Sequence, residues 1–177
     1  MITIRQYTAE DAKQALDIFR LSIKDIDESE YSFEQKQAWL GAIDNDFDKN
    51  IESQRQQANW QQRLDKTKPL IATDNKNTMI GFIEFLIDQD QCNQFKCGEA
   101  YIDCLYVHPK YQRRGVAQIL YDEMWLSLLK NNIEIVWVYA SKLAYSFFLK
   151  QGFKIVERQA VKRHNVSLER YLMCKHI

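Results

Sequence analysis

The sequence lacks an excess of charge of either sign. Its 177 residues hold 24 Lys and Arg against 24 Asp and Glu, so the formal net charge at pH 7 is zero. A chain dedicated to nucleic acid or to an anionic membrane surface normally carries a clear positive excess. We therefore expect neither nucleic acid nor a membrane as a partner, and any local cluster of cations needs a local explanation.

The sequence also lacks a long apolar run, and we expect no secretory signal. No apolar stretch approaches the roughly 20 residues that span a bilayer. The opening residues MITIRQYTAEDA contain neither the basic nor the apolar region of a secretory signal. We therefore expect a cytoplasmic protein. With 46% apolar residues, disorder is not expected, and the length suits one domain over residues 1–177.

Candidate metal ligands are few. The four cysteines are Cys92, Cys97, Cys104 and Cys174, and their spacing fits no common zinc site. His108 is typical of a turn, and no second His or acidic residue stands at ligand spacing from it. We therefore predict no metal and mostly reduced thiols, with a Cys92–Cys97 disulfide left open as an alternative.

The sequence does contain clear periodic signals. Apolar residues at helical spacing predict helices over about 12–26, after Ser32, over about 115–130 and from Ser141. Residues 44–66 are polar and are consistent with a loop plus a surface helix around 51–64. Strand signals occupy residues 2–7, 70–73, 79–87, 100–107, 133–139, 153–161 and 166–175. This order predicts an α+β fold with a mixed, largely antiparallel central sheet and helices on both faces. The nearly continuous apolar run at 133–139 predicts a central strand buried on both sides.

A basic stretch stands where one strand passes into a helix. The segment YVHPKYQRRGVAQ (residues 106–118) places three cations and Gly115 directly before the helix. Helix N-termini expose unpaired N–H groups and a partial positive charge, which bind phosphates. The segment lacks the pattern of a Walker A loop and of a G-x-G-x-x-G fingerprint. It therefore predicts a pyrophosphate site, with a helix start that carries solvated arginines as the alternative.

These motifs resemble those of the GNAT superfamily of N-acetyltransferases. QRRGVA (residues 112–117) resembles the family's acetyl-CoA signature R/Q-x-x-G-x-G/A. IDCLYVHP (residues 102–109) looks like its fourth strand, and ASKLAYSFFLKQGF (residues 140–153) looks like its second landmark. Gly81 matches the usual third strand, and the element order agrees over nearly the whole chain.

The resemblance implies acetyl-CoA as co-substrate. The pantetheine arm would pair with the exposed edge of the fourth strand, and the pyrophosphate would lie on the loop before the next helix. The helix from Ser141, which replaces the family's usual Asn, would flank the thioester. The residues expected to bind acetyl-CoA are Leu105, Tyr106, Val107, Gln112, Arg113, Arg114, Gly115, Val116, Ala117, Ser141, Ala144 and Phe147.

Acetyl transfer to an amine needs a base, and acidic residues inside apolar strands are the candidates. Asp103 is the first choice and Glu84 the second; the alternative is that either one faces solvent or pairs with an arginine. A backbone N–H near Leu105 or Tyr106 would stabilise the oxyanion.

The family's usual general acid is a tyrosine, and Phe148 stands in its place. Tyr145 is the main candidate for a displaced acid, with Tyr139 and Tyr106 nearby and water as the alternative donor.

The sequence therefore predicts an acetyl-CoA-dependent N-acetyltransferase that acts on a primary amine of a small molecule, a peptide or a protein. Two alternatives stay open: a different donor such as succinyl-CoA, and a CoA-binding regulatory or sensor domain without efficient turnover. The acceptor would be set by variable elements, here residues 24–66, and a homodimer is left open.

Overall fold

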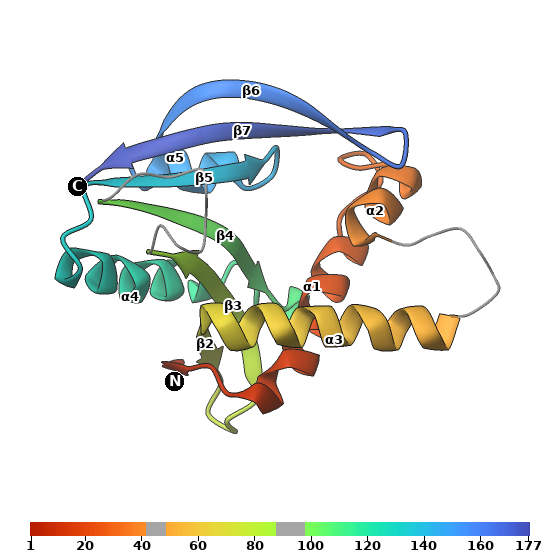
Figure 1. Ribbon diagram of the computed structural model, residues 1–177, viewed down its shortest axis with the longest axis horizontal. Coiled ribbons are helices and arrows are strands. Elements are labelled where there is room, and N and C mark those ends of the chain that lie inside the picture. Colours follow the sequence, from red (N-terminus) through yellow and green to blue (C-terminus); the bar gives the residue numbers. More distant parts are fainter. Residues whose placement is uncertain (42–48, 88–97) are drawn as a thin grey trace. The chain divides into compact units, whose positions relative to one another are not determined.

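Antiparallel pairing dominates the sheet of this protein. The structure, a computed structural model, describes residues 1–41, 49–87 and 98–177. Seven strands within these residues follow the order β1-β2-β3-β4-β5-β7-β6 (Figure 1). The strands are β1 (Thr3–Gln6), β2 (Leu70–Thr73), β3 (Met79–Leu86), β4 (Glu99–Val107), β5 (Ile135–Ser141), β6 (Lys154–Arg163) and β7 (Val166–His176). β4 and β5 pair in parallel, and β1–β2, β2–β3, β5–β7 and β6–β7 pair antiparallel, which confirms the predicted α+β class.

The helices lie close to where periodicity predicts them. They are α1 (Ala12–Lys24), α2 (Phe33–Leu40), α3 (Lys49–Thr67), α4 (Val116–Lys130) and α5 (Tyr145–Lys150). The surface helix predicted around residues 51–64 is confirmed as α3, which is longer than expected. Among the described residues, no helix is both long and apolar enough to cross a membrane.

The contacts of the chain group it into two compact units. The first comprises Met1–Glu84 and Leu105–Glu123, and the second comprises Phe85–Cys104 and Met124–Ile177. Both β4 and α4 therefore contribute residues to each unit.

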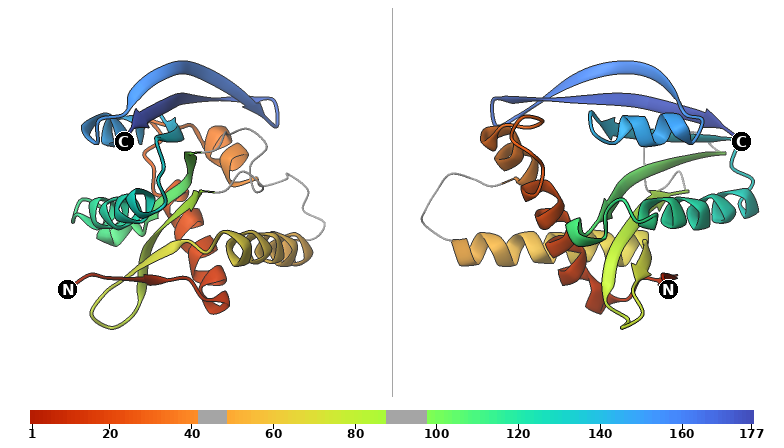
Figure 2. Two further views of the ribbon diagram at one scale, coloured as in Figure 1. Left: turned by 60° about the vertical axis from the view of Figure 1, so that its left-hand side comes forward. Right: turned by 180° about the vertical axis from the view of Figure 1, so that it is seen from behind.

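Helix packing forms the core of the first unit. The buried face of α1 includes Leu16, Phe19 and Ile23, whose spacing is that of one helical stripe. The Phe19 ring lies 4.9 Å from the Trp60 ring of α3, centroid to centroid. Figure 2 shows α1 crossing α3. Leu64 of α3 is fully buried, so this polar helix is anchored by a few large side chains.

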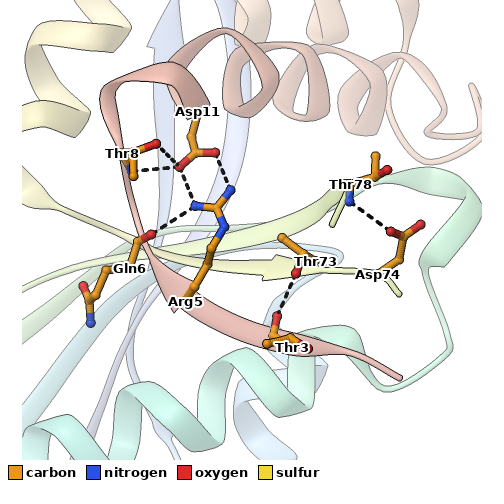
Figure 3. Close-up of polar contacts among 8 residues, drawn as sticks. All are labelled: Thr3, Arg5, Gln6, Thr8, Asp11, Thr73, Asp74 and Thr78. Atoms are coloured by element: carbon orange, nitrogen blue, oxygen red, sulfur yellow. Dashed lines mark hydrogen bonds and ion pairs between the residues drawn. The ribbon is translucent and has the colours of Figure 1, made fainter. Parts of the chain in front are cut away.

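A carboxylate closes the start of the α1 region. The sequence predicts a capping box at Thr8 and Asp11, and an Asp11 oxygen accepts the Thr8 N–H at 2.8 Å. Arg5 donates to both carboxylate oxygens, at 2.7 and 2.6 Å (Figure 3). Burial alone would raise the pKa of Asp11, but the hydrogen bonds from Arg5 and Thr8 hold that pKa below its usual value.

The second unit contains a long hairpin beside β5. β6 and β7 pair from Lys154↔Cys174 to Arg163↔Val166 (Figure 1). The turn residues His164 and Asn165 both have positive φ, at 48° and 63°. This combination is typical of the two-residue type I′ turn, whose twist matches that of the strands.

β5 is buried on one face only. Val136, Val138 and Ala140 are buried, whereas Trp137 and Tyr139 between them are half-buried. The prediction that this strand is buried on both sides was therefore wrong. Aromatic rings with a polar tip make a strand look continuously apolar in sequence although they tolerate a partly wet face.

Candidate functional site

The connection from β4 to α4 is exposed and basic. We call residues 108–115 the β4–α4 loop. Gln112, Arg113, Arg114 and Gly115 are all exposed. Arg113 has a φ of 59° and Gly115 a φ of 82°, so two of four successive residues adopt the left-handed conformation. Such a conformation is uncommon for a non-glycine residue and is more frequent at functional turns.

Side chains fix this loop at several points. The Gln112 amide donates to the Val107 carbonyl at 3.1 Å. The Tyr111 hydroxyl donates to Asp74, in the turn between β2 and β3, at 3.0 Å. The Arg114 guanidinium lies 5.7 Å from the centroid of the Tyr111 ring. His108 is the predicted turn residue, and its ring accepts the Lys110 N–H at 3.2 Å.

The first turn of α4 adds backbone donors to these cations. The helical hydrogen bond nearest the start runs from Ile119 N–H to Gly115 O at 3.0 Å. The amides of residues 116–118 therefore belong to the turn that a helix leaves without intrahelical acceptors. They carry the positive end of the helix dipole. Exposed guanidinium groups and helix-start amides thus come together, which is an arrangement that binds anions.

Gly81 allows the start of α4 to lie close to the sheet. A Cβ at this position would lie 2.9 Å from the Tyr106 carbonyl oxygen and 3.3 Å from the Val116 side chain. Both distances are too short for an ordinary contact. The glycine that matched the family's third strand therefore has a packing reason in the structure.

The end of β4 offers its backbone to one side. The His108 N–H donates to the Ile80 carbonyl of β3 at 2.8 Å. Successive N–H groups of an extended strand point to opposite sides. The N–H of Tyr106 therefore points toward β3, whereas those of Leu105 and Val107 point away from it.

Two of these residues also serve the packing of the first unit. The Tyr106 ring packs against Phe19, with centroids 5.1 Å apart. The Val107 carbonyl accepts from Gln112 and from the Ser22 hydroxyl at 3.0 Å, a hydrogen that Ser22 shares with the Ile18 carbonyl.

The ladder between β4 and β5 is short. It runs from Glu99↔Ile135 to Ile102↔Val138. Both strands continue beyond this point, to Val107 and to Ser141.

The two candidate bases have different surroundings. Asp103, in the second unit, is exposed and lies 3.8 Å from the Cys104 sulfur. Glu84, in the first unit, is completely buried. Its carboxylate accepts from Arg63 at 2.7 Å and from the Thr67 hydroxyl at 2.8 Å. The ion-paired alternative therefore describes Glu84, because Arg63 neutralises it.

The connection from β5 to α5 is closed by its own residues. The Ser141 hydroxyl accepts the Ala144 N–H at 3.2 Å, and α5 begins only at Tyr145, later than predicted. The Tyr145 ring stacks on Tyr171 of β7, with centroids 4.7 Å apart.

Phe148 is a core residue. It is 3% exposed and packs edge-on against Phe147 and Phe153, both with centroids at 5.3 Å. A phenyl ring at the position of the family's acid therefore serves packing.

Arg170 was not predicted from the sequence. Its guanidinium lies 3.8 Å from the centroid of the Tyr139 ring, on the neighbouring strand. Only the pairing of β5 with β7 brings these residues together, so no local pattern could have found the contact. Neither Cys104 nor Cys174 forms a disulfide within the described residues, and the Cys92–Cys97 alternative lies outside them.

Comparisons with known proteins agree with this arrangement. Residues 27–171 match the family model of the acetyltransferase (GNAT) domain. The N-acetyltransferase YafP of Escherichia coli (strain K12) is 31% identical over 161 residues, which cover 91% of this chain and 87% of that protein. A GCN5-related N-acetyltransferase from Rhodopseudomonas palustris has a TM-score of 0.78 at 29% identity and covers 99% of this chain and 95% of its own. The PaiA N-acetyltransferase of Thermoplasma acidophilum, solved in complex with coenzyme A, has a TM-score of 0.69 at 22% identity, covering 100% and 99%.

Proposed function

This chain belongs to the GNAT acetyltransferase family, and from that premise we propose that it transfers an acetyl group from acetyl-CoA to a primary amine of a small molecule or peptide. We further propose that residues 1–177 act as one acetyltransferase domain. The observation that carries the proposal is the β4–α4 loop, with its exposed cations, its two left-handed residues and its helix-start amides.

The loop fits a pyrophosphate. A Cβ built on Gly115 would have no atom within 4 Å, so the backbone there is open to a ligand. The amides from Arg113 to Ala117 would hold the phosphate oxygens, with Gln112, Arg113 and Arg114 beside them.

The strand end would hold the pantetheine arm. Leu105 and Val107 present N–H groups on the side away from β3, which suits a ligand that pairs like an added strand. The short β4–β5 ladder supports this, because β4 continues beyond its last residue pair with β5. Of the two oxyanion donors considered, we choose the Leu105 N–H, since that of Tyr106 points to β3. Ser141, Ala144 and Phe147 stay predicted contacts of the thioester from the family resemblance alone.

We assign the base to Asp103. Acetyl-CoA supplies the activated acetyl group, and the residues of the chain must accept the proton that the amine loses. An exposed carboxylate on β4 can accept that proton directly or through water, whereas Glu84 is already paired with Arg63.

Substitution of the two carboxylates tests this assignment. Asp103→Asn should lower kcat by roughly 10²–10⁴-fold while acetyl-CoA affinity barely changes. Glu84→Gln should act mainly on the fold, with a loss of about 1–3 kcal/mol in unfolding free energy, because it leaves Arg63 without its ionic partner. Steady-state kinetics, calorimetry and urea melts separate the two. A large loss of turnover in a stable Glu84→Gln protein would reverse the assignment.

A CoA-binding sensor without turnover is the second candidate. The buried Phe148 at the family's acid position favours it, because this ring cannot donate a proton to the departing thiolate. Thiol release over a panel of amines distinguishes the two functions. Tight acetyl-CoA binding without release for any amine would support the sensor.

A further inference from the structure

One sheet face of the second unit carries several aromatic rings together with an acid and an arginine. Residues opposite each other in a ladder share a face. Tyr101 lies opposite Trp137, and Ser141 lies opposite Arg170. Because side chains alternate along β5, Trp137, Tyr139 and Ser141 project to one face, and Tyr101 and Arg170 join them there. We call this the aromatic face.

Asp103, the proposed base, belongs to the aromatic face as well. It follows Tyr101 by two residues on β4 and therefore projects to the same side. The Tyr101 and Tyr139 rings pack edge to face, with their planes at 69° and their centroids 6.0 Å apart. The Tyr139 ring on β5 thus lies between β4, which carries Asp103, and the guanidinium of β7, and the Tyr101 ring lies beside Tyr139 on β4.

Helix α5 packs on the opposite face of these strands. Tyr145 of α5 stacks on Tyr171, which neighbours Arg170 in β7 and so points the other way. Val136 and Val138 of β5 are buried and, one residue out of step with Trp137 and Tyr139, project to that opposite side. On the aromatic face, Tyr101, Tyr139 and their neighbours in β5 and β7 are half-buried.

Arg170 is held in one orientation. Its Nε donates to the Gln159 side-chain oxygen at 3.0 Å, and the Gln159 amide donates in turn to Glu157 at 2.8 Å. The Tyr139 ring supports the guanidinium from below at 3.8 Å. Within the described residues, the two terminal nitrogens of Arg170 have no hydrogen-bond acceptor. A guanidinium fixed through Nε in this way presents a pair of N–H groups that matches a carboxylate.

The two charges lie within reach of one small ligand. β4 and β7 are separated by β5, so their axes are about 10 Å apart. Arg170 leans over Tyr139, which shortens that span. Burial raises the pKa of the Tyr101 phenol; the Asp103 charge raises this pKa further, and the Arg170 charge lowers it. Tyr101 therefore stays neutral, and its phenol is influenced by the charges of both Asp103 and Arg170.

We propose that the acceptor is a primary amine that also carries a carboxylate, with its nitrogen toward Asp103 and its carboxylate on Arg170. This inference rests on the proposed function and adds the acceptor's chemical class. The negative end of the face attracts an ammonium group, the positive end attracts an anion, and the Tyr139 ring contacts the carbons between. A single guanidinium balances the one charge of a carboxylate.

The transfer balances for such an acceptor. The ammonium group first loses a proton to Asp103, directly or through water. The nitrogen then forms a bond to the acetyl carbon, and the carbon–sulfur bond breaks with its electron pair on sulfur. The nitrogen loses a second proton, one proton ends on sulfur and one in solvent, so the products are an amide, a thiol and a proton.

Matched acceptors test the proposal. Glycine, 4-aminobutyrate and 6-aminohexanoate would each be compared with their carboxamides by kcat/KM under saturating acetyl-CoA. We expect the wild-type enzyme to prefer the carboxylate at least tenfold for the member whose length fits the face. In Arg170→Gln, the ratio of carboxylate to carboxamide should fall at least tenfold.

Arg158→Gln is the matched control. Arg158 lies on the adjacent strand opposite Tyr171, and therefore on the other face, where it pairs with Glu169 at 2.7 Å. Its substitution should leave the ratio unchanged. If Arg170→Gln fails to fold, Gln159→Leu is the second variant. It keeps the charge of Arg170 but removes the side-chain oxygen that orients its guanidinium, so the ratio of carboxylate to carboxamide kcat/KM should fall about threefold.

The outcomes distinguish a failure of the proposed acceptor class from a failure of the proposed acetyltransferase function. If carboxylates and carboxamides are acetylated equally and neither Arg170→Gln nor Gln159→Leu changes their ratio, this inference is overturned while the proposed function stands. If acetyl-CoA binds but no amine of either kind is acetylated, both fall together.

Discussion

The connection from β4 to α4 is exposed and carries Arg113 and Arg114, whereas the one from β5 to α5 (residues 142–144) is short and uncharged apart from Lys142. Both follow a strand and enter a helix. At the second, the Ser141 hydroxyl accepts the Ala144 N–H. In the β4–α4 loop, two left-handed residues precede α4, and the Gln112 side chain fixes the loop by donating to the Val107 carbonyl.

The difference shows what makes a helix start available to a ligand. Every helix exposes N–H groups in its first turn, but a side-chain cap satisfies some of them within the chain. Before α5, the N–H of Ala144, one residue before the helix begins, is satisfied within the chain by the hydroxyl and the carbonyl of Ser141. The α4 start is preceded by exposed cations and a glycine, so an external anion can take the place of the cap.

The largest effect is expected from a substitution in the β4–α4 loop that weakens acetyl-CoA binding. Gly115→Glu adds a negative charge and a side chain where the backbone is open and φ is 82°. Acetyl-CoA affinity, measured by calorimetry, should fall at least tenfold, or about 1.4 kcal/mol.

Gly41→Glu provides the matched control for this substitution. Gly41 also has a positive φ, of 69°, and a Cβ there would meet nothing within 4 Å. The two variants therefore impose similar backbone strain, and only Gly115→Glu should weaken binding. Equal affinities would remove the β4–α4 loop from the cofactor site.

A smaller effect should follow at the second connection. Ser141→Ala removes one of the two acceptors of the Ala144 N–H and leaves the Ser141 carbonyl at 3.0 Å, so the unfolding free energy should fall by less than about 1 kcal/mol. Acetyl-CoA affinity should fall far less than in Gly115→Glu. Ser141→Asn, which restores the family's usual residue, is the conservative companion, and urea melts give the stability. A tenfold loss of affinity in Ser141→Ala would mean that the hydroxyl binds the ligand in addition to accepting the Ala144 N–H.

A third connection, from β1 into α1, adds a useful contrast, because there the Asp11 carboxylate accepts the Thr8 N–H. The pKa of Asp11 is held below its ordinary value in the folded chain, so its stabilisation is present above about pH 4 and is lost as pH falls through the folded pKa. Asp11→Asn should cost less than about 1 kcal/mol at neutral pH, since Arg5 is partly exposed. Melts from pH 2 to 7 should show the gap between wild type and variant closing in acid. A gap that is constant with pH would contradict this account.

The smallest effect is expected from Tyr145, the first residue of α5. Tyr145→Phe keeps the ring that stacks on Tyr171 and removes only the hydroxyl. Turnover should fall at most about threefold, roughly 0.7 kcal/mol of barrier, and the alkaline limb of the pH–rate profile should persist. A loss of a hundredfold with intact acetyl-CoA binding would make Tyr145 the displaced general acid. Phe148→Tyr is the companion variant that restores the family's residue.

Local patterns in the sequence were enough to predict most of the fold. The apolar runs of β2 and β3 flank a short polar turn, and the apolar stripe of α1 recurs every three or four residues, so each signal can be read from neighbouring residues. The β4–α4 loop was predicted for the same reason, because its cations and Gly115 are consecutive residues at a strand-to-helix boundary.

The remaining features depend on pairings between distant residues. Glu84 is neutralised by Arg63 of α3, and Arg170 meets Tyr139 only through the register of β5 and β7. The one-sided burial of β5 likewise depends on which elements cover each face, which its apolar run does not encode. A candidate base could therefore be proposed from sequence, but the two candidates could be ranked with physical reasons only from their contacts.

The Val107 carbonyl has a consequence for the direction in which a ligand can lie. Its oxygen already accepts from Gln112 and shares the Ser22 hydrogen, and a carbonyl oxygen has only two lone pairs. A chain of amides along the end of β4 would meet N–H groups at Leu105 and Val107, but an available carbonyl only at Leu105. The two directions of such a ligand are then not equivalent. An arm with its amide bonds reversed would place its own N–H group against the N–H group of Val107. If the pantetheine arm pairs here as proposed, the strand end should therefore bind an amide better than its retro-isomer, because of an oxygen that the ligand itself does not contact.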